Sequence, residues 1–325
     1  MSSKTFALCS IMSLSAGMSI AEAPQVAVDI APVHSLVARV MEGVGTPDLI
    51  IPAGASPHEY NLRPSEAASL QNADVVFWVS ASLTPWMKNA IETLAEDAVV
   101  TELFEVEGTL KLPFRQGVLF EEHDDHDGHD DHDGHDDHEG HDDHEAHDDH
   151  EGHNHDGDDP HAWLSPDNAA VWLNAIAQTL SKVDPDNASQ YYLNAAAGQK
   201  ELRELSTKIN GILAPFEGRN FIVFHDAFQY FEKAFDFYAA GAISLSDARD
   251  PSPARIAKIQ NRINEQNISC ILSEPQFNPN IVAAVASGSD VKMGILDPLG
   301  VGLELGETLY FQTLHNLAKA LSDCL

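Results

Sequence analysis

A tract of histidine and carboxylate residues interrupts this chain between residues 121 and 159. Histidine recurs at every third position through most of the tract, and aspartate or glutamate fills most of the other positions. A period of three matches neither the 3.6-residue period of an α-helix nor the two-residue period of a strand, and almost no side chain there is apolar. We therefore expect a disordered loop within an otherwise folded protein.

The composition of the tract favours metal binding. Neutral imidazole and carboxylate groups bind divalent ions such as Zn²⁺, and no lysine or arginine interrupts the tract to repel a cation. Most acidic runs only keep a surface solvated, but solubility does not require histidine at a regular spacing. We interpret the tract as an accessory metal-binding loop with the histidines His123, His126, His129, His132, His135, His138, His141, His144, His147, His150, His153 and His155.

The charge balance restricts the partners of the whole chain. The formal net charge is −33, and the tract holds 20 of the carboxylates, so the remainder still carries −13. A chain this acidic is not expected to bind nucleic acid or an anionic membrane, and it favours a cationic ligand.

The first 23 residues are typical of a cleavable secretory signal. A single lysine precedes an apolar stretch from Phe6 to Ile20, and Ala21-Glu22-Ala23 stands before Pro24. No later stretch reaches the length of apolar sequence that a transmembrane helix needs. We expect an exported protein without a transmembrane segment.

Two cysteines follow this segment, Cys270 and Cys324. Export would place them in a compartment where disulfides persist, and we predict that they pair. Two buried free thiols are the alternative, which the spacing does not exclude.

Short apolar runs alternate with amphipathic stretches on both sides of the tract. This alternation is typical of βαβ units with mostly parallel sheets, and it predicts two α/β lobes. The runs cover residues 26–30, 49–51, 75–79 and 99–101 before the tract, and 221–224, 239–243, 268–272 and 291–296 after it.

A long helical pattern lies between the two sets of runs. It follows Asp184-Pro185, carries Leu202, Leu205 and Ile209 at helical spacing, and ends before Pro215. One such helix would join the lobes as a rigid connector rather than as a flexible hinge. The expected divisions are a signal peptide at 1–23, an N-terminal lobe at 24–184 that includes the loop, a linking helix at 185–214, and a C-terminal lobe at 215–325.

Three of the five histidines outside the tract lie where α/β proteins bind ligands. His58 follows an expected strand, His161 precedes a helix, and His225 ends a strand. Because ligands collect beyond the carboxyl ends of parallel strands, these imidazoles can converge in one cleft. His34 and His315 lie in helical stretches, and we interpret both as structural.

Three imidazoles suit Zn²⁺ better than Mn²⁺ and leave a fourth tetrahedral position. The candidates for that position are Asp297, at another expected strand end, and Glu59, which adjoins His58. A water molecule or a histidine of the tract is the further alternative.

Five motifs resemble one protein family. They read GASPHEYNLRPSEAASLQNADVVFWV, PHAWLSP, VFHDAFQYFEK, EPQF and MGILDPLG. These segments are similar to the zinc-binding (ZnuA-type) subfamily of periplasmic solute-binding proteins that serve ABC importers. The resemblance extends over nearly the whole chain after the signal, and the histidine tract and the cysteine pair resemble that family too.

The resemblance implies an architecture and a function. Two α/β lobes joined by one long rigid helix would hold Zn²⁺ in the cleft between them through His58, His161 and His225. The protein would be a periplasmic monomer of the Gram-negative type that captures Zn²⁺ with high affinity and delivers it to an ABC importer permease in the inner membrane. Its histidine loop would assist acquisition or sense excess zinc, and other periplasmic zinc donors are further partners.

Two details of the motifs refine this implication. Manganese-binding relatives place glutamate where this chain has His225, which favours zinc. Some zinc-binding members carry an acidic residue immediately before the first histidine, where this chain has Pro57. A carboxylate ligand from that position is therefore excluded.

Other functions compete with this interpretation. A secreted zinc hydrolase also uses three histidines and an open position, but the motif H-E-x-x-H is absent, so we expect no enzyme. A periplasmic metal buffer or storage protein would use the tract as its main site. Within the carrier class, Cu²⁺ would also bind three imidazoles tightly, so the ligands alone do not name the cargo.

Overall fold

The computed structural model describes residues 23–115, 120, 157–244 and 251–325. The expected signal peptide, apart from its residue 23, lies outside these residues. So do residues 121–156 of the accessory loop expected at 121–159, which include all twelve of its histidines. Within the described ranges, no helix combines the length and the apolar character needed to cross a bilayer.

The first lobe is built on a four-stranded parallel sheet with the order β2-β1-β3-β4. The two central strands are buried along their whole length, as expected for a parallel sheet whose faces are both covered. The elements in chain order are β1 (Val26–Ile30), α1 (Ala31–Val40), β2 (Asp48–Ile51), α2 (Pro64–Gln71), β3 (Val75–Trp78), α3 (Pro85–Leu94) and β4 (Val99–Glu102).

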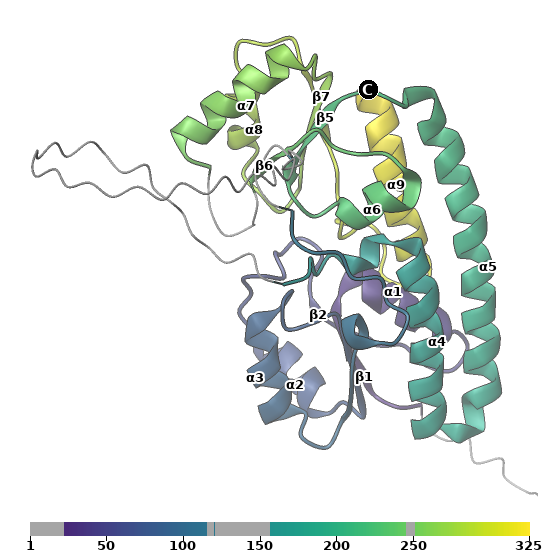
Figure 1. Cartoon of the computed structure of the whole chain (residues 1–325). Helices are drawn as coiled ribbons and strands as arrows, with labels where there is room; N and C mark the ends of the chain where they lie inside the picture. The colour runs from purple at the N-terminus through teal and green to yellow at the C-terminus, as the bar shows by residue number, and fades with distance from the viewer. Residues whose placement is uncertain (1–22, 116–119, 121–156, 245–250) are drawn as a thin grey trace, which may run out of the picture.

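The second lobe repeats this plan with the order β6-β5-β7-β8, again all parallel. The two lobes lie one above the other in Figure 1, and the expectation of two parallel α/β lobes is confirmed. The elements are β5 (Phe221–His225), α6 (Gln229–Phe235), β6 (Ala242–Ser244), α7 (Pro253–Glu265), β7 (Cys270–Ser273), α8 (Pro279–Ala286), β8 (Lys292–Ile295) and α9 (Leu309–Cys324).

A long helix connects the sheets, as the sequence predicts. Helix α5 (Ala188–Leu213) has 26 residues and therefore spans about 39 Å at 1.5 Å per residue. It runs alongside both lobes in Figure 1 and packs against α4 (Pro166–Val183). Gly198 permits the close approach, because a Cβ atom there would lie 3.0 Å from Cδ1 of Leu173. The domain limits at residues 184 and 214 stay predictions.

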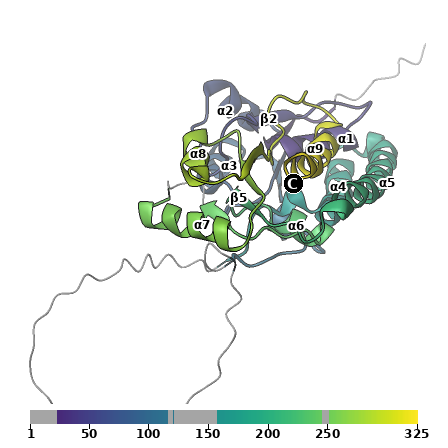
Figure 2. The same ribbon diagram turned by 90° about the horizontal axis from the view of Figure 1, so that it is seen from above.

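Helix α9 begins against the first lobe and ends at the second, and it packs against α1 and α5. Seen from above in Figure 2, α9 lies with α1, α4 and α5 at one side of the molecule. The buried Tyr310 fixes this contact: its backbone N–H donates to Oγ of Ser35 on α1 at 2.9 Å, and its hydroxyl donates to the carbonyl of Trp163 at 2.7 Å. One hydrophobic core thus includes side chains from both lobes.

A disulfide joins Cys270, the first residue of β7, to Cys324, the last residue of α9, with their Cα atoms 5.8 Å apart. The predicted pairing is confirmed, and the alternative of two free thiols is wrong. The bridge attaches the end of α9 to the second sheet.

We predict that replacing both cysteines with alanine lowers the free energy of unfolding by about 2–4 kcal/mol, because the bridge closes a loop with a sequence separation of 54 residues in the unfolded chain. Urea denaturation of the mature chain measures this. A reductant should destabilise the wild type by a similar amount and leave the variant unchanged. Equal stability of the oxidised wild type and the variant would contradict the prediction.

Candidate metal centre

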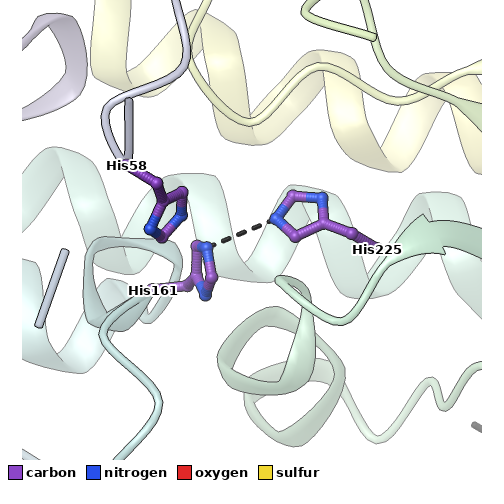
Figure 3. Close-up of side chains that lie close together, drawn as sticks. All are labelled: His58, His161 and His225. Carbon is purple, nitrogen blue, oxygen red and sulfur yellow. Dashed lines mark hydrogen bonds between the residues drawn. The ribbon is translucent and has the colours of Figure 1, made fainter. Parts of the chain in front are cut away.

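Three histidines meet between the two lobes. His58 comes from the loop between β2 and α2, His161 precedes the 3₁₀ turn Ala162–Leu164 that leads into α4, and His225 is the last residue of β5. One ligand nitrogen from each lies within 4.8 Å of the others, and Figure 3 shows the rings of His161 and His225 facing each other. His161 and His225 are buried, whereas His58 is half-buried. The structure therefore brings the three predicted ligands together.

The spacing of the nitrogens suits a single ion. Nε2 of His161 and Nε2 of His225 are 3.3 Å apart. Two nitrogens bound tetrahedrally to Zn²⁺ at about 2.0–2.1 Å stand about 3.3–3.4 Å from each other. The observed separation therefore leaves room for one small cation between the rings.

A buried aspartate orients His161. Oδ1 of Asp159 accepts from Nδ1 of that ring at 2.6 Å and from the backbone N–H of His161 at 3.0 Å. The second carboxylate oxygen accepts from Nε2 of Gln229 on α6 at 3.1 Å. Asp159 is only 1% exposed, so its geometry is set by these contacts.

A glutamate orients the ring of His225 in the same way. Oε1 of Glu274 accepts from Nδ1 of His225 at 2.6 Å and from its backbone N–H at 3.2 Å. Strand β5 pairs with β7 in the register Phe221 with Cys270. Continued to the end of β5 and to the residue after β7, this register sets Glu274 opposite His225.

These two carboxylates decide which ring nitrogens face the cleft. When Nδ1 donates its proton to a carboxylate, Nε2 keeps its lone pair and becomes more basic. Two lone pairs facing each other at 3.3 Å repel unless a cation lies between them. The arrangement thus suits a metal ion, with the orientation of both rings fixed by carboxylates.

An arginine balances two further buried carboxylates beside the site. Nη1 of Arg115 donates to Glu232 at 2.6 Å, and Nε donates to Asp226, the neighbour of His225, at 3.0 Å. Burial raises the pKa of Asp226, and it raises the pKa of Glu232 to about 7, while the charge of Arg115 opposes both changes. Burial alone would lower the pKa of Arg115, but the two carboxylates raise it above its ordinary value.

The segment before the histidine tract is hydrogen-bonded to the last residues of the tract beside the site. The backbone N–H of Asp159 donates to the carbonyl of Leu112 at 2.8 Å, and that of Phe114 donates to Gly157 at 3.3 Å. The hydroxyl of Tyr230 on α6 donates to the carbonyl of Asp159 at 2.7 Å and accepts from the N–H of Leu112 at 3.0 Å. We call residues 112–115 and 157–159 the stem of the tract.

Neither candidate for the fourth ligand joins the three histidines among the described residues. Glu59 is exposed. The carboxylate of Asp297 accepts from the backbone N–H groups of Leu299 and Gly300 at 3.0 and 3.1 Å, and also from that of Val301, so it shapes the turn after β8. The identity of the fourth ligand stays a prediction.

The remaining predicted positions have local roles. Pro57, before the first ligand, accepts a hydrogen bond from Nε1 of Trp86 through its carbonyl at 3.0 Å and so holds the His58 loop. Nε2 of His34 lies 2.9 Å from the carbonyl of Pro47 and is buried. His315 lies on α9.

Sequence reasoning assigned no role to Asp159 or Glu274. Asp159 was counted with the tract, although it stands two residues before His161. At this spacing the carboxylate can contact the imidazole ring. Glu274 lies two residues after the expected strand at 268–272 and directly follows β7, which was the available signal for a second group at the same sheet edge.

The family model described as zinc-uptake complex component A, periplasmic (ZnuA), matches residues 26–324 of the chain. The chain belongs to the ZnuA family. The high-affinity zinc uptake system protein ZnuA of Brucella abortus is 45% identical over 314 residues, which are 95% of this chain and 94% of that protein. The ZnuA of Paracoccus denitrificans is 45% identical over 306 residues, 94% of this chain and 93% of that protein. The resemblance found in the motifs is confirmed.

Solved structures of ZnuA-like proteins share this fold. A crystal structure of ZnuA matches with a TM-score of 0.71 and 21% identity over 93% of this chain and 99% of that one. The periplasmic zinc-binding protein TroA from Treponema pallidum matches with a TM-score of 0.74 and 18% identity over the same shares of the two chains.

We predict that Glu274→Gln weakens binding of Zn²⁺ roughly 10–100-fold, the usual loss when the hydrogen-bond partner of a metal-binding imidazole is changed. The amide keeps the size of the side chain and removes the charge that makes His225 basic. Competition with a chelator at one equivalent of metal measures the affinity. Glu265→Gln, at an exposed position on α7, is the matched control and should bind as the wild type does. Equal affinities of the two variants would show that Glu274 has no such role.

Proposed function

We propose that this chain captures Zn²⁺ in the periplasm and delivers it to the permease of an ABC importer in the inner membrane. Membership of the ZnuA family supports this proposal, as does the name of its relatives, high-affinity zinc uptake system proteins. The observation that carries it is the convergence of three imidazole nitrogens between the lobes. The monomeric state and further periplasmic zinc donors stay predictions.

The burial of the ligands indicates how an ion enters and leaves. His161 and His225 are fixed in the interior by Asp159 and Glu274, whereas His58 is half-buried on a loop. Loops move more readily than packed elements. We therefore assign binding strength to the two interior imidazoles and opening of the site to the His58 loop.

The histidine tract fits the role of an accessory binder. Its stem includes Asp159, the residue that orients His161, so the tract joins the folded protein at the metal centre itself. An ion leaving the tract at the stem would reach the cleft over a short distance.

The hydrolase alternative receives no support from this geometry. A hydrolase needs a group that takes a proton from metal-bound water. The carboxylates next to the rings, Asp159 and Glu274, instead accept hydrogen bonds from ring Nδ1 atoms. The buffer alternative differs from the carrier in where the tight site lies, and a binding experiment separates the two.

We predict that a variant lacking residues 121–156 keeps one tight Zn²⁺ site in calorimetry. The hydrogen bond between Phe114 and Gly157 holds the chain ends together, so the deletion leaves the stem and Asp159 in place. Adding His58→Ala, His161→Ala or His225→Ala should lower the affinity of that site for Zn²⁺. The loss should exceed the roughly 10–100-fold expected when a carboxylate that hydrogen-bonds a ligand imidazole is changed. His315→Ala, a histidine on α9, should have no effect. A deletion variant without a tight site would favour the buffer.

We also predict that a bacterial strain lacking this chain stops growing under zinc chelation and recovers with added Zn²⁺ but not with added Mn²⁺ or Cu²⁺. The chain supplied on a plasmid should restore growth, and the His225→Ala form should not, because uptake requires the cleft. Rescue of growth by the His225→Ala form would show that zinc uptake does not require this site.

A further inference from the structure

Gln276 connects the two lobes at the rim of the metal centre. It lies two residues after Glu274, and its Nε2 donates to the carbonyl of Ala53 at 3.0 Å and to Oδ1 of Asp297 at 3.3 Å. Ala53 belongs to the loop that leads from β2 to His58. Gln276 also lines the pocket that contains the three histidines.

The orientation of this amide follows from its partners. Both groups that contact Nε2 are acceptors, a backbone carbonyl and a carboxylate. A rotated amide would set its oxygen against two other oxygens, so the nitrogen must occupy this position. The amide is therefore oriented with Nε2 toward Ala53 and Asp297, and its carbonyl oxygen Oε1 contacts neither of these acceptors.

Oε1 of Gln276 is buried, and none of the described residues donates a hydrogen bond to it. A buried acceptor without a donor costs free energy, so it indicates a donor that arrives with a ligand. The rings of His161 and His225 donate through Nδ1 to carboxylates and present lone pairs to the pocket. Most of the other lining side chains are apolar: Pro57, Trp163, Phe277, Pro298 and Leu299.

We propose that Gln276 is a positioning residue whose Oε1 accepts a hydrogen bond from the water molecule that fills the fourth position on cleft-bound Zn²⁺. This inference rests on the proposed function. Three imidazoles leave one tetrahedral position, and Glu59 and Asp297 lie outside the histidine cluster. Water bound to a divalent metal is a strong donor because the metal withdraws electron density from it.

The choice of an amide has a consequence for transport. A neutral acceptor holds the water without adding a negative ligand, so the fourth position remains easy to exchange when the ion passes to the permease. Because the same amide donates to Ala53, the water is tied to the loop that carries His58. Movement of that loop would then loosen both the imidazole and the water.

Cobalt absorption spectra of the full mature chain test this proposal. One equivalent of Co²⁺ replaces zinc, and the strong visible bands of tetrahedral cobalt report the cleft as the pH is raised. The acceptor stabilises bound water relative to bound hydroxide, so Gln276→Leu should lower the pH of the alkaline transition by roughly 0.5–1 unit, the equivalent of one neutral hydrogen bond. Gln276→Glu supplies a stronger acceptor and should raise the pH of the alkaline transition or abolish the transition.

The two variants separate positioning of the water from a structural role. If Gln276 acts only through its nitrogen, glutamate and leucine both remove the donor and should shift the transition alike, which would overturn the proposal. A transition in Gln276→Leu at the wild-type pH, or no transition in the wild type, would also overturn it. His58→Ala should lose the tetrahedral bands. If it keeps them, the three-histidine site itself fails, an outcome distinct from failure of the Gln276 assignment.

Discussion

The metal centre depends on a packed interior that passes through both lobes. Trp163 and Tyr310 form its central link: the indole N–H donates to the carbonyl of Pro298 at 3.0 Å, and the tyrosine hydroxyl donates to the carbonyl of Trp163 at 2.7 Å. Both side chains are fully buried, and α5 packs alongside them with α1, α4 and α9. Since close-packed interiors do not deform continuously, this packing opposes a change in the arrangement of the two lobes. We therefore expect only a small movement of the lobes when the ion binds.

Four buried carboxylates lie around that centre. Asp159 and Glu274 are each only a few per cent exposed and face imidazoles, which are neutral when they bind metal. Asp226 and Glu232 both pair with Arg115. Buried carboxylates cost free energy unless they are paired. A divalent ion on the imidazoles would lie one side chain away from Asp159 and Glu274 and would reduce the cost of burying these two negative charges.

Much of this organisation could be predicted from local patterns. The eight strands follow from short apolar runs, and Ser165-Pro166 marks the start of α4, where the serine hydroxyl accepts from the backbone N–H of Asn168. The three histidines stood out because each adjoins the end of a regular element. Contacts between distant segments could not be predicted, because the pairing of β5 with β7, which sets Glu274 behind His225, has no signature in either strand. The role of Asp297 could not be assigned either, because a carboxylate after a strand can cap a turn as well as bind a metal.

The stem has an evolutionary consequence for the segment that it encloses. The bridge between Pro113 and Asp158 closes the polypeptide before the repeats begin. Closing a flexible insertion costs only about 0.6 kcal/mol more for each doubling of its length. Repeats can therefore be gained or lost at a small cost in free energy, because the stem joins the folded body on either side of them. The number of imidazoles that the segment carries can change while the geometry of the binding cleft is kept.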